Sequence, residues 1–291
     1  MGSTCVAGNW SADPNVDASA TGGGQNESEV GPTTTVAGAG AIDPMLLDYV
    51  APTNGDAWMA AKLRFDVGVA RAKAATVAEC VEAKGFPGAE SLRIDDARVW
   101  ASGIIMNLPA LNRLAERGFA NPPLPVTPEY DAAFSCSEED VSEATRWQTT
   151  AENLGMFIFE DLPAAIDATE SKPVWTEAVA CMTAAGAPPD LLAQAAADEQ
   201  RHIEEGGDPM GGHGFDVYLG EWVNEHNRSP HPDFPGYVVS AEAKAFVRCV
   251  RPFFAEVERA LAGPRAAFVE EHRDELLALQ REYEAFDVDG D

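Results

Sequence analysis

Two short stretches decide the fold of this chain: Cys80-Val81-Glu82-Ala83-Lys84-Gly85-Phe86-Pro87 and Cys181-Met182-Thr183-Ala184-Ala185-Gly186-Ala187-Pro188. When they are aligned on their cysteines, Cys, Ala, Gly and Pro coincide at the same offsets. Helices often end at a Gly in the left-handed conformation, and a nearby Pro prevents their continuation. In both stretches the Cys then lies in the penultimate turn of a helix that ends at the Gly. The two stretches therefore predict two related helix ends, produced by an internal duplication.

The residues that lead up to each stretch keep helical spacing. In the first unit the spacing predicts a helix from about residue 56 to 84, with a buried stripe formed by Met59, Leu63, Val67, Ala70, Ala74, Val77 and Val81. In the second unit Ser171 is the expected N-cap and Pro173 lies in the first turn. The shared face of that helix is formed by Val174, Ala178, Cys181 and Ala185. Both cysteines thus lie on or beside a buried stripe.

The rest of the chain is also helical in pattern. One stripe, in which Pro252 is expected to kink or interrupt the helix, is formed by Phe246, Cys249, Val250, Phe253, Val257 and Leu261. A final helix is expected after Gly263-Pro264, and its buried face is formed by Phe268, His272, Leu276, Leu279, Tyr283 and Phe286. The segments 91–118, 138–160, 188–205 and 214–227 show no sustained β-branched alternation. We predict an all-α protein of two related helical units, residues 44–162 and 163–291, the second ending in two long helices.

The cysteines of the chain are Cys5, Cys80, Cys136, Cys181 and Cys249. None forms a CxxC motif or has a neighbour at zinc-ligand spacing. The last four either stay reduced as small buried hydrophobes or pair in one of three ways. The duplication favours one disulfide in each unit, Cys80–Cys136 and Cys181–Cys249.

The charge of the chain excludes one class of partner. Its 291 residues include 20 Lys+Arg and 48 Asp+Glu, which gives a formal net charge of -28. Proteins bind nucleic acids and anionic lipid headgroups through Lys and Arg, so a surface this acidic is repelled by both. We expect no nucleic-acid partner. We also expect no membrane-spanning helix, because the sequence contains no run of about 18 apolar residues.

Residues 1–43 differ in composition from the rest of the chain. They are rich in Gly, Ser, Thr and Asn, and the first basic residue of the sequence is Lys62. Such a segment has too little apolar surface to offset its ordering entropy, so it is predicted to be a disordered tether. It contains neither the basic n-region nor the apolar run of a secretory signal peptide.

The order of these landmarks resembles that of a known group of proteins. Cys80-Val81-x-x-x-Gly85-Phe86, Cys136, Trp175-x5-Cys181-Met182-x-x-x-Gly186 and a late Cys249 are similar to the pattern of an uncharacterised family of secreted lipoproteins from high-GC Gram-positive bacteria. The resemblance covers residues 45–286 and implies an extracytoplasmic location without implying an activity. It also implies that Cys5 is lipidated and that residues 6–43 form the tether, an interpretation that assumes a hydrophobic leader upstream of Met1. The alternative is that Cys5 is an ordinary thiol in a flexible tail.

The best candidate for a binding site is a cluster of histidines and carboxylates between residues 198 and 231. We select as candidate metal ligands His202, Glu205, Asp208 and His213. Imidazole combined with carboxylate, or with Met, suits a divalent metal ion or copper, and a Gly-rich loop over 206–214 would fold around it. The alternative is a solvated acidic helix end followed by a loop. The aromatic residues raise a further alternative, because they either belong to the core or line a groove for an apolar ligand or partner. The residues of this predicted groove are Trp100, Trp147, Phe157, Phe159, Trp175, Tyr218 and Trp222.

These observations lead to three functional hypotheses. No GxSxG, P-loop or Rossmann motif occurs, so we first expect a non-enzymatic, lipid-anchored binding or accessory protein at the cell surface, with an envelope component or a small ligand as its partner. The second hypothesis is a metal-binding protein that uses the cluster at 198–231 and has no other cofactor. The third is an enzyme of a type not recognised, which requires ionisable groups that converge in a pocket.

Overall fold

A computed structural model gives the fold of the chain. It describes residues 41–95, 108–117, 127–155, 157–208, 212–224 and 239–286, so the predicted tether and Cys5 lie outside the described residues, apart from positions 41–43. Within these ranges every regular element is a helix, which confirms the all-α prediction. The α-helices are α1 (Pro44–Val50), α2 (Gly55–Ala83), α4 (Leu111–Arg117), α5 (Pro128–Glu139), α6 (Glu143–Leu154), α7 (Phe157–Glu170), α8 (Pro173–Ala184), α9 (Leu191–Glu204), α10 (Gly214–Val217), α11 (Ala241–Glu271) and α12 (Arg273–Glu284). A π-helix, η1 (Tyr218–Asn224), directly continues α10.

The two aligned stretches form the same helix end. After α2 the chain turns through Gly85 at φ +90°, and after α8 it turns through Gly186 at φ +111°. In each case the next residue sends its N–H back to the carbonyl five residues earlier, from Phe86 to Val81 (2.9 Å) and from Ala187 to Met182 (3.0 Å). This is the Schellman arrangement, which satisfies carbonyls that a helix end would otherwise leave free. The predicted pair of related helix ends is therefore confirmed.

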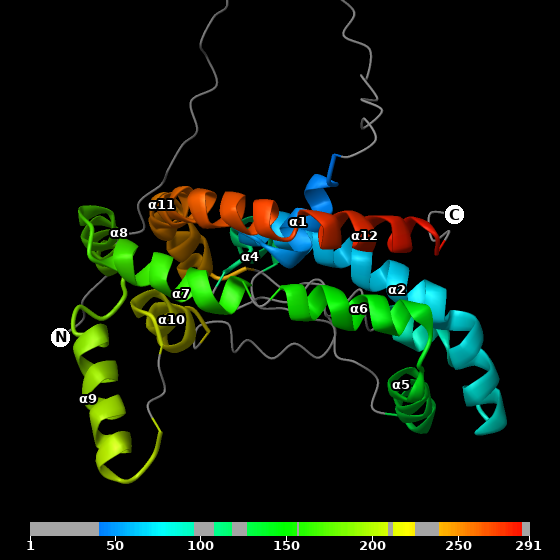
Figure 1. Ribbon diagram of the computed structural model, residues 1–291. Coiled ribbons are helices and arrows are strands. Elements are labelled where there is room, and N and C mark those ends of the chain that lie inside the picture. Colours follow the sequence, from blue (N-terminus) through cyan, green and yellow to red (C-terminus); the bar gives the residue numbers. More distant parts are fainter. Residues whose placement is uncertain are drawn as a thin grey trace, which may run out of the picture. The chain divides into compact units, whose positions relative to one another are not determined.

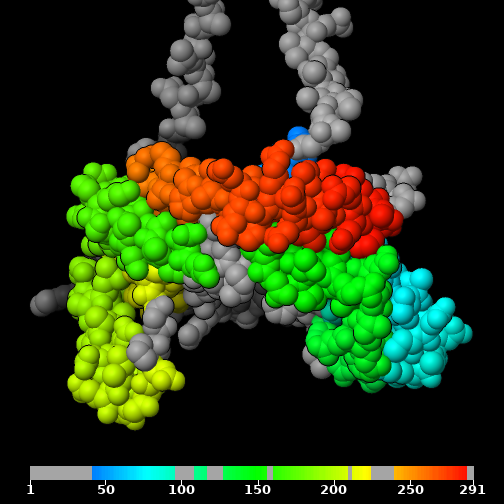
Figure 2. Space-filling view, in the orientation of Figure 1, coloured from blue at the N-terminus to red at the C-terminus, as the bar shows by residue number. Residues whose placement is uncertain are grey.

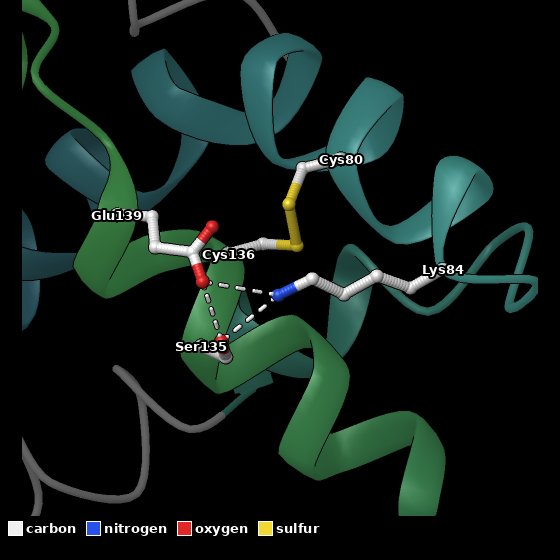
Figure 3. The surroundings of a disulfide bond; sticks show 5 residues. All are labelled: Cys80, Lys84, Ser135, Cys136 and Glu139. Atoms are coloured by element: carbon white, nitrogen blue, oxygen red, sulfur yellow. Dashed lines mark hydrogen bonds and ion pairs between the residues drawn. A yellow bond between two sulfur atoms is a disulfide. The ribbon is translucent and has the colours of Figure 1, made fainter.

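Both predicted disulfides are present. Cys80 on α2 pairs with Cys136 on α5, with their Cα atoms 5.8 Å apart. Cys181 on α8 pairs with Cys249 on α11, with a Cα separation of 5.5 Å. Figure 3 shows the side chain of Lys84 beside the first disulfide, where its Nζ donates to Ser135 Oγ (2.9 Å) and lies 3.2 Å from a Glu139 oxygen. Each disulfide thus joins two helices that are far apart in the sequence.

Apolar side chains gather in three clusters. The largest is built by α4, α7, α8, α10, η1 and most of α11. The second is built by α1, α2, α6, α12 and Phe268 at the end of α11, and a small third cluster surrounds Cys136. Residues of both predicted units contribute to each of the two larger clusters, because α4 packs with the second unit and α12 packs with the first. Figure 1 shows α11 and α12 following one another, with α7 beside α11 and α6 beside α12.

Helix α11 differs from the sequence-based expectation. It continues through Pro252 and Pro264 to Glu271, and the break before the last helix falls at His272. The predictions that Pro252 interrupts the helix and that the final helix begins after Gly263-Pro264 were wrong in these respects. A proline removes one backbone hydrogen bond, but Pro252 is exposed while Phe253 beside it is fully buried. Burial of the apolar face of α11 therefore holds the helix together despite the missing bond.

Two smaller expectations also needed correction. Leu63 on α2 is 45% exposed, whereas Phe65 and Val69 are buried, because α1, α4, α5 and α6 all pack on α2 and widen its buried face. The N-cap of α8 is Lys172 rather than Ser171, and the Ser171 hydroxyl donates to the carbonyl of Ala168 instead (2.8 Å).

Helix α9 stands apart from the clusters. Leu191 is its one buried residue, and the rest of its surface is exposed or partly exposed. Figure 2 shows α9, in yellow-green, extending away from α8 and α11. Among the described residues, no helix has the length and apolar character needed to cross a membrane.

Candidate cation site at the junction of α7 and α10

The structure separates the residues that the sequence grouped as metal ligands. His202, Glu205 and Asp208 are exposed at the end of α9 and in the turn after it. His213 immediately precedes α10, and only 13% of its side chain is exposed. Within the part of the chain that the structure describes, the group of three close metal-binding side chains contains His213 but none of the other three.

The partners of His213 come from the last turn of α7. Its Nδ1 lies 3.2 Å from Oδ1 of Asp167, and the neighbouring Glu170 accepts the backbone N–H of Gly214 at 2.7 Å. One ligand atom from each of Asp167, Glu170 and His213 lies within 4.8 Å of the other two. We call these three residues, together with Asp216, the α7–α10 site.

Gly214, the first residue of α10, lets α10 approach α7 closely. A Cβ atom at this position would lie 2.7 Å from Cζ2 of Trp175 and 3.1 Å from Oε1 of Glu170. No side chain fits in that space, so the backbone N–H of Gly214 reaches Glu170 only because the residue is glycine. The indole of Trp175, on α8, closes the other side of this contact.

Aromatic side chains of α8 and α11, the two helices that the second disulfide joins, support this arrangement. Trp175 packs against Phe253 of α11, with 5.1 Å between ring centroids, and Phe215 packs edge-on against Phe254 at 4.9 Å. The Cys181–Cys249 bond joins the same two helices, α8 and α11. The ring of His213 stacks on Phe215, with centroids 5.9 Å apart and planes 7° apart. The position of the imidazole is therefore set by a covalently closed aromatic scaffold.

Burial changes the acidity of two carboxyl groups in the site. It raises the pKa of Glu170, although the backbone N–H groups of Gly214 and Phe215 and the charge of His213 act in the opposite direction. Burial also raises the pKa of Asp216 to about 6. The Oδ2 atom of Asp216 accepts the backbone N–H of His213 at 3.2 Å. Its Oδ1 atom is buried and has no hydrogen-bond partner among the described residues.

The site combines residue types that hold divalent cations. Two carboxylates and an imidazole offer oxygen and nitrogen donors of the kind found at Zn²⁺ and Mn²⁺ sites. The same contacts also serve a structural purpose without a cation, since Glu170 fixes the start of α10 and Asp167 pairs with His213. These contacts therefore hold α10 against α7 with or without a bound cation.

Asp167 and Glu170 were missed by sequence reasoning. They lie 46 and 44 residues before their contacts at 213 and 214, and no local motif joins the two segments. One signal was present, because both carboxylates fall in the last turn of a helix, where the helix dipole disfavours negative charge. Acidic side chains at that position indicate a compensating partner elsewhere in the fold.

Of the aromatic residues predicted to line a groove, Trp147, Trp175, Tyr218 and Trp222 are instead part of the core, whereas Trp100 and the side chains of Phe157 and Phe159 lie outside the described residues. Trp147 and Tyr218 are 1% exposed, Trp222 is 2% exposed and Trp175 is 9% exposed. Their rings pack against other core aromatics, as Trp147 does against Tyr49 and Tyr283. These four side chains are thus buried in the interior and line no groove.

A cavity of about 170 Å³ lies between the start of α2 and the middle of α11. Its ionisable groups are engaged in holding helices together. Asp56 accepts the backbone N–H of Asn112 at 2.9 Å, and Arg251 donates to the side chain of the same Asn112 at 2.9 Å. Two other lining residues are also paired, since Asn54 donates to Glu258 at 3.1 Å. These contacts cap α4 and dock it on α2 and α11.

A comparison of the chain with models of known protein families, with curated proteins and with solved structures found no match.

Proposed function

We propose that this chain is an extracytoplasmic, lipid-anchored helical protein that acts by binding at the α7–α10 site rather than by catalysis. The observation that carries the proposal is the Cys181–Cys249 disulfide. It fixes α8 against α11, and these two helices supply Trp175 and Phe253, against which Gly214 and Phe215 are held. A covalent bond that maintains one set of side chains in place is suited to a preformed binding site.

The two disulfides indicate an oxidising, extracytoplasmic location. The finer location is part of the proposal: Cys5 bears the lipid, and residues 6–43 connect it to the helices. A net charge of -28 repels anionic headgroups, so the lipid is the expected membrane contact. A single acyl chain binds membranes only weakly, which favours the multiply acylated anchor of a lipoprotein.

The proposed anchoring is tested by fractionating cells of the native host that produce either the full chain or its Cys5→Ala variant. We expect the unaltered protein in the membrane fraction, partitioning into detergent, and the variant in the soluble extracytoplasmic fraction. Mass spectrometry of the N-terminal peptide should show acyl groups on Cys5. An unacylated Cys5, or equal distribution of the two proteins, would reject the anchor. Recovery of both proteins from the cytoplasm with free thiols would reject the location.

The proposed role of the site is tested separately from the location. The variants Asp167→Asn and His213→Gln change the donor groups while conserving side-chain size. Because Asp167 is 71% exposed, its replacement leaves the core untouched. We expect both variants to reach the envelope at wild-type levels and to lose the accessory activity, scored as the phenotype of a deletion strain. Full complementation by both variants would show that the site is not where the protein acts.

A further inference from the structure

We infer that the α7–α10 site binds one divalent first-row transition-metal ion, of the Mn²⁺ or Zn²⁺ class, through Asp167, Glu170 and His213. This inference rests on the proposed function, because it names the ligand of that binding site. The sequence alone pointed to a different set, in which His213 was joined by His202, Glu205 and Asp208. The geometry replaces those three residues by two carboxylates of α7.

The separations between donor atoms match those around such an ion. Bonds of about 2.0–2.2 Å to each ligand place neighbouring ligand atoms about 3 Å apart and opposite ones little more than 4 Å apart. Nδ1 of His213 and Oδ1 of Asp167 are 3.2 Å apart, and all three donor atoms fit within 4.8 Å. The ligands therefore need only small side-chain rotations to close on an ion.

The local charge also favours a cation. Asp167, Glu170 and Asp216 bring three carboxyl groups around a single imidazole, and His213 is the one basic side chain among the charges that act on Glu170 and Asp216. Glu170 and Asp216 are partly buried, and neighbouring carboxylates in such a position are disfavoured unless a positive charge compensates them. An ion of charge +2 supplies that compensation.

An independent observation comes from Asp216. Its Oδ1 atom is buried and lacks a hydrogen-bond partner among the described residues, which is uncommon for a carboxylate oxygen. Asp216 lies outside the close group of three ligands. It is a positioning residue, because its other oxygen accepts the backbone N–H of His213. A carboxylate oxygen without a protein partner can accept a hydrogen bond from water, and outer-sphere carboxylates hold metal-bound water in this way at many sites.

The donor set also indicates which ions are disfavoured. Ca²⁺ takes six to eight oxygen ligands, whereas this site supplies a nitrogen and two carboxylates. Soft Cu(I) is selected by thiolate or thioether ligands, and the group of three contains no sulfur. A mixed imidazole and carboxylate set is best suited to Zn²⁺ or Mn²⁺.

The test is isothermal titration calorimetry of the full, oxidised chain after removal of metal with a chelator. Mn²⁺, Zn²⁺ and Ca²⁺ are titrated separately into wild-type protein and into the variants Asp167→Asn, His213→Gln and His202→Gln. We expect 1:1 binding of Mn²⁺ or Zn²⁺, weakened at least about tenfold by the first two changes, since even the loss of an outer-sphere partner costs that much. His202→Gln is the matched control, because this exposed histidine belongs to the sequence-predicted set, and it should bind as the wild type does.

Circular dichroism and thermal unfolding in chelator show whether each variant is folded, so that a loss of binding is assigned to the ligands. Three results would overturn the inference: no binding of either transition metal to the wild type, binding of Ca²⁺ alone, or binding that depends on His202 and survives His213→Gln. None of these results affects the fractionation of the Cys5→Ala variant or the complementation experiment. Failure of the cation inference is therefore distinguishable from failure of the proposed function.

Discussion

The indole ring of Trp175 lies directly against Gly214, so close that a Cβ atom added to Gly214 would be 2.7 Å from Cζ2 of Trp175. This contact joins α8 to the first residue of α10 and leaves the Gly214 N–H pointing at Glu170. The residue before it is His213. The placement of the candidate ligands thus depends on how tightly one tryptophan and one glycine pack.

Gly214→Ala should damage the α7–α10 site. The added methyl group has no room, so α10 must shift away from Trp175 and Glu170, and overpacking of this kind typically costs about 1–3 kcal/mol. We expect a lower free energy of unfolding in urea, together with weaker cation binding. Gly212→Ala is the control, because a Cβ at that position meets no atom within 4 Å. Equal effects of the two changes would show that the packing of Gly214 is unimportant.

The two disulfides should contribute similarly to stability but differently to the site. Their sequence separations are 56 and 68 residues, so the chain-entropy contributions differ by only about 0.2 kcal/mol. Replacing either pair by serine should lower the free energy of unfolding by about 2–5 kcal/mol. Only the loss of Cys181–Cys249 should also weaken cation binding, measured by calorimetry on folded protein. Equal weakening by loss of Cys80–Cys136 would contradict the scaffold described for the site.

Trp147→Phe tests a buried contact between α6 and α12. The indole N–H of Trp147 donates to the carbonyl of Leu279 at 2.7 Å, and both residues are at most 2% exposed. Phenylalanine leaves this carbonyl buried without a partner, which costs about 1–3 kcal/mol. We expect the free energy of unfolding, measured with denaturant and circular dichroism, to fall by that amount. The control Trp58→Phe, at a half-buried position on α2, should lower it much less.

Asp140→Asn should reveal a pH-dependent contribution to stability. Burial opposes ionisation of Asp140, but hydroxyl donors from Ser142 (2.5 Å) and Thr145 (2.6 Å) outweigh it and lower the pKa of this carboxyl group. Because the pKa is lower in the folded state, ionised Asp140 stabilises the fold at pH values above the ordinary carboxyl range near pH 4. This stabilisation is lost as the pH falls through the folded-state pKa. Thermal unfolding should therefore separate wild type from variant at pH 7 and bring them together toward pH 3. A gap that stays constant would contradict the role of the charge.

Much of the fold could be predicted from local patterns. The left-handed glycines, Gly85 and Gly186, mark helix ends because few other residues adopt that conformation. The duplicated Cys80 and Cys181 identified both disulfides. The path of α11 through Pro252 could not be predicted, because the burial of Phe253 and Phe254 against other helices decides it and local propensity does not.

The candidate site was predictable only in part. His213 was selected from its neighbours in sequence, but its contacts are made by α7, which packs beside α11 and α8. His202 and Asp208 were selected by the same proximity in sequence, and they lie exposed around the end of α9. Sequence proximity fails here because His202, Glu205 and Asp208 lie exposed at and after the end of α9, whereas His213 lies beside Asp167 of α7.

The most direct measurement is an anomalous difference map from a crystal of the oxidised full chain grown with Mn²⁺. We expect one strong peak within bonding distance of Asp167, Glu170 and His213. A map without a peak at the α7–α10 site, or with its strongest peak beside His202, would contradict the assignment of these three residues as cation ligands.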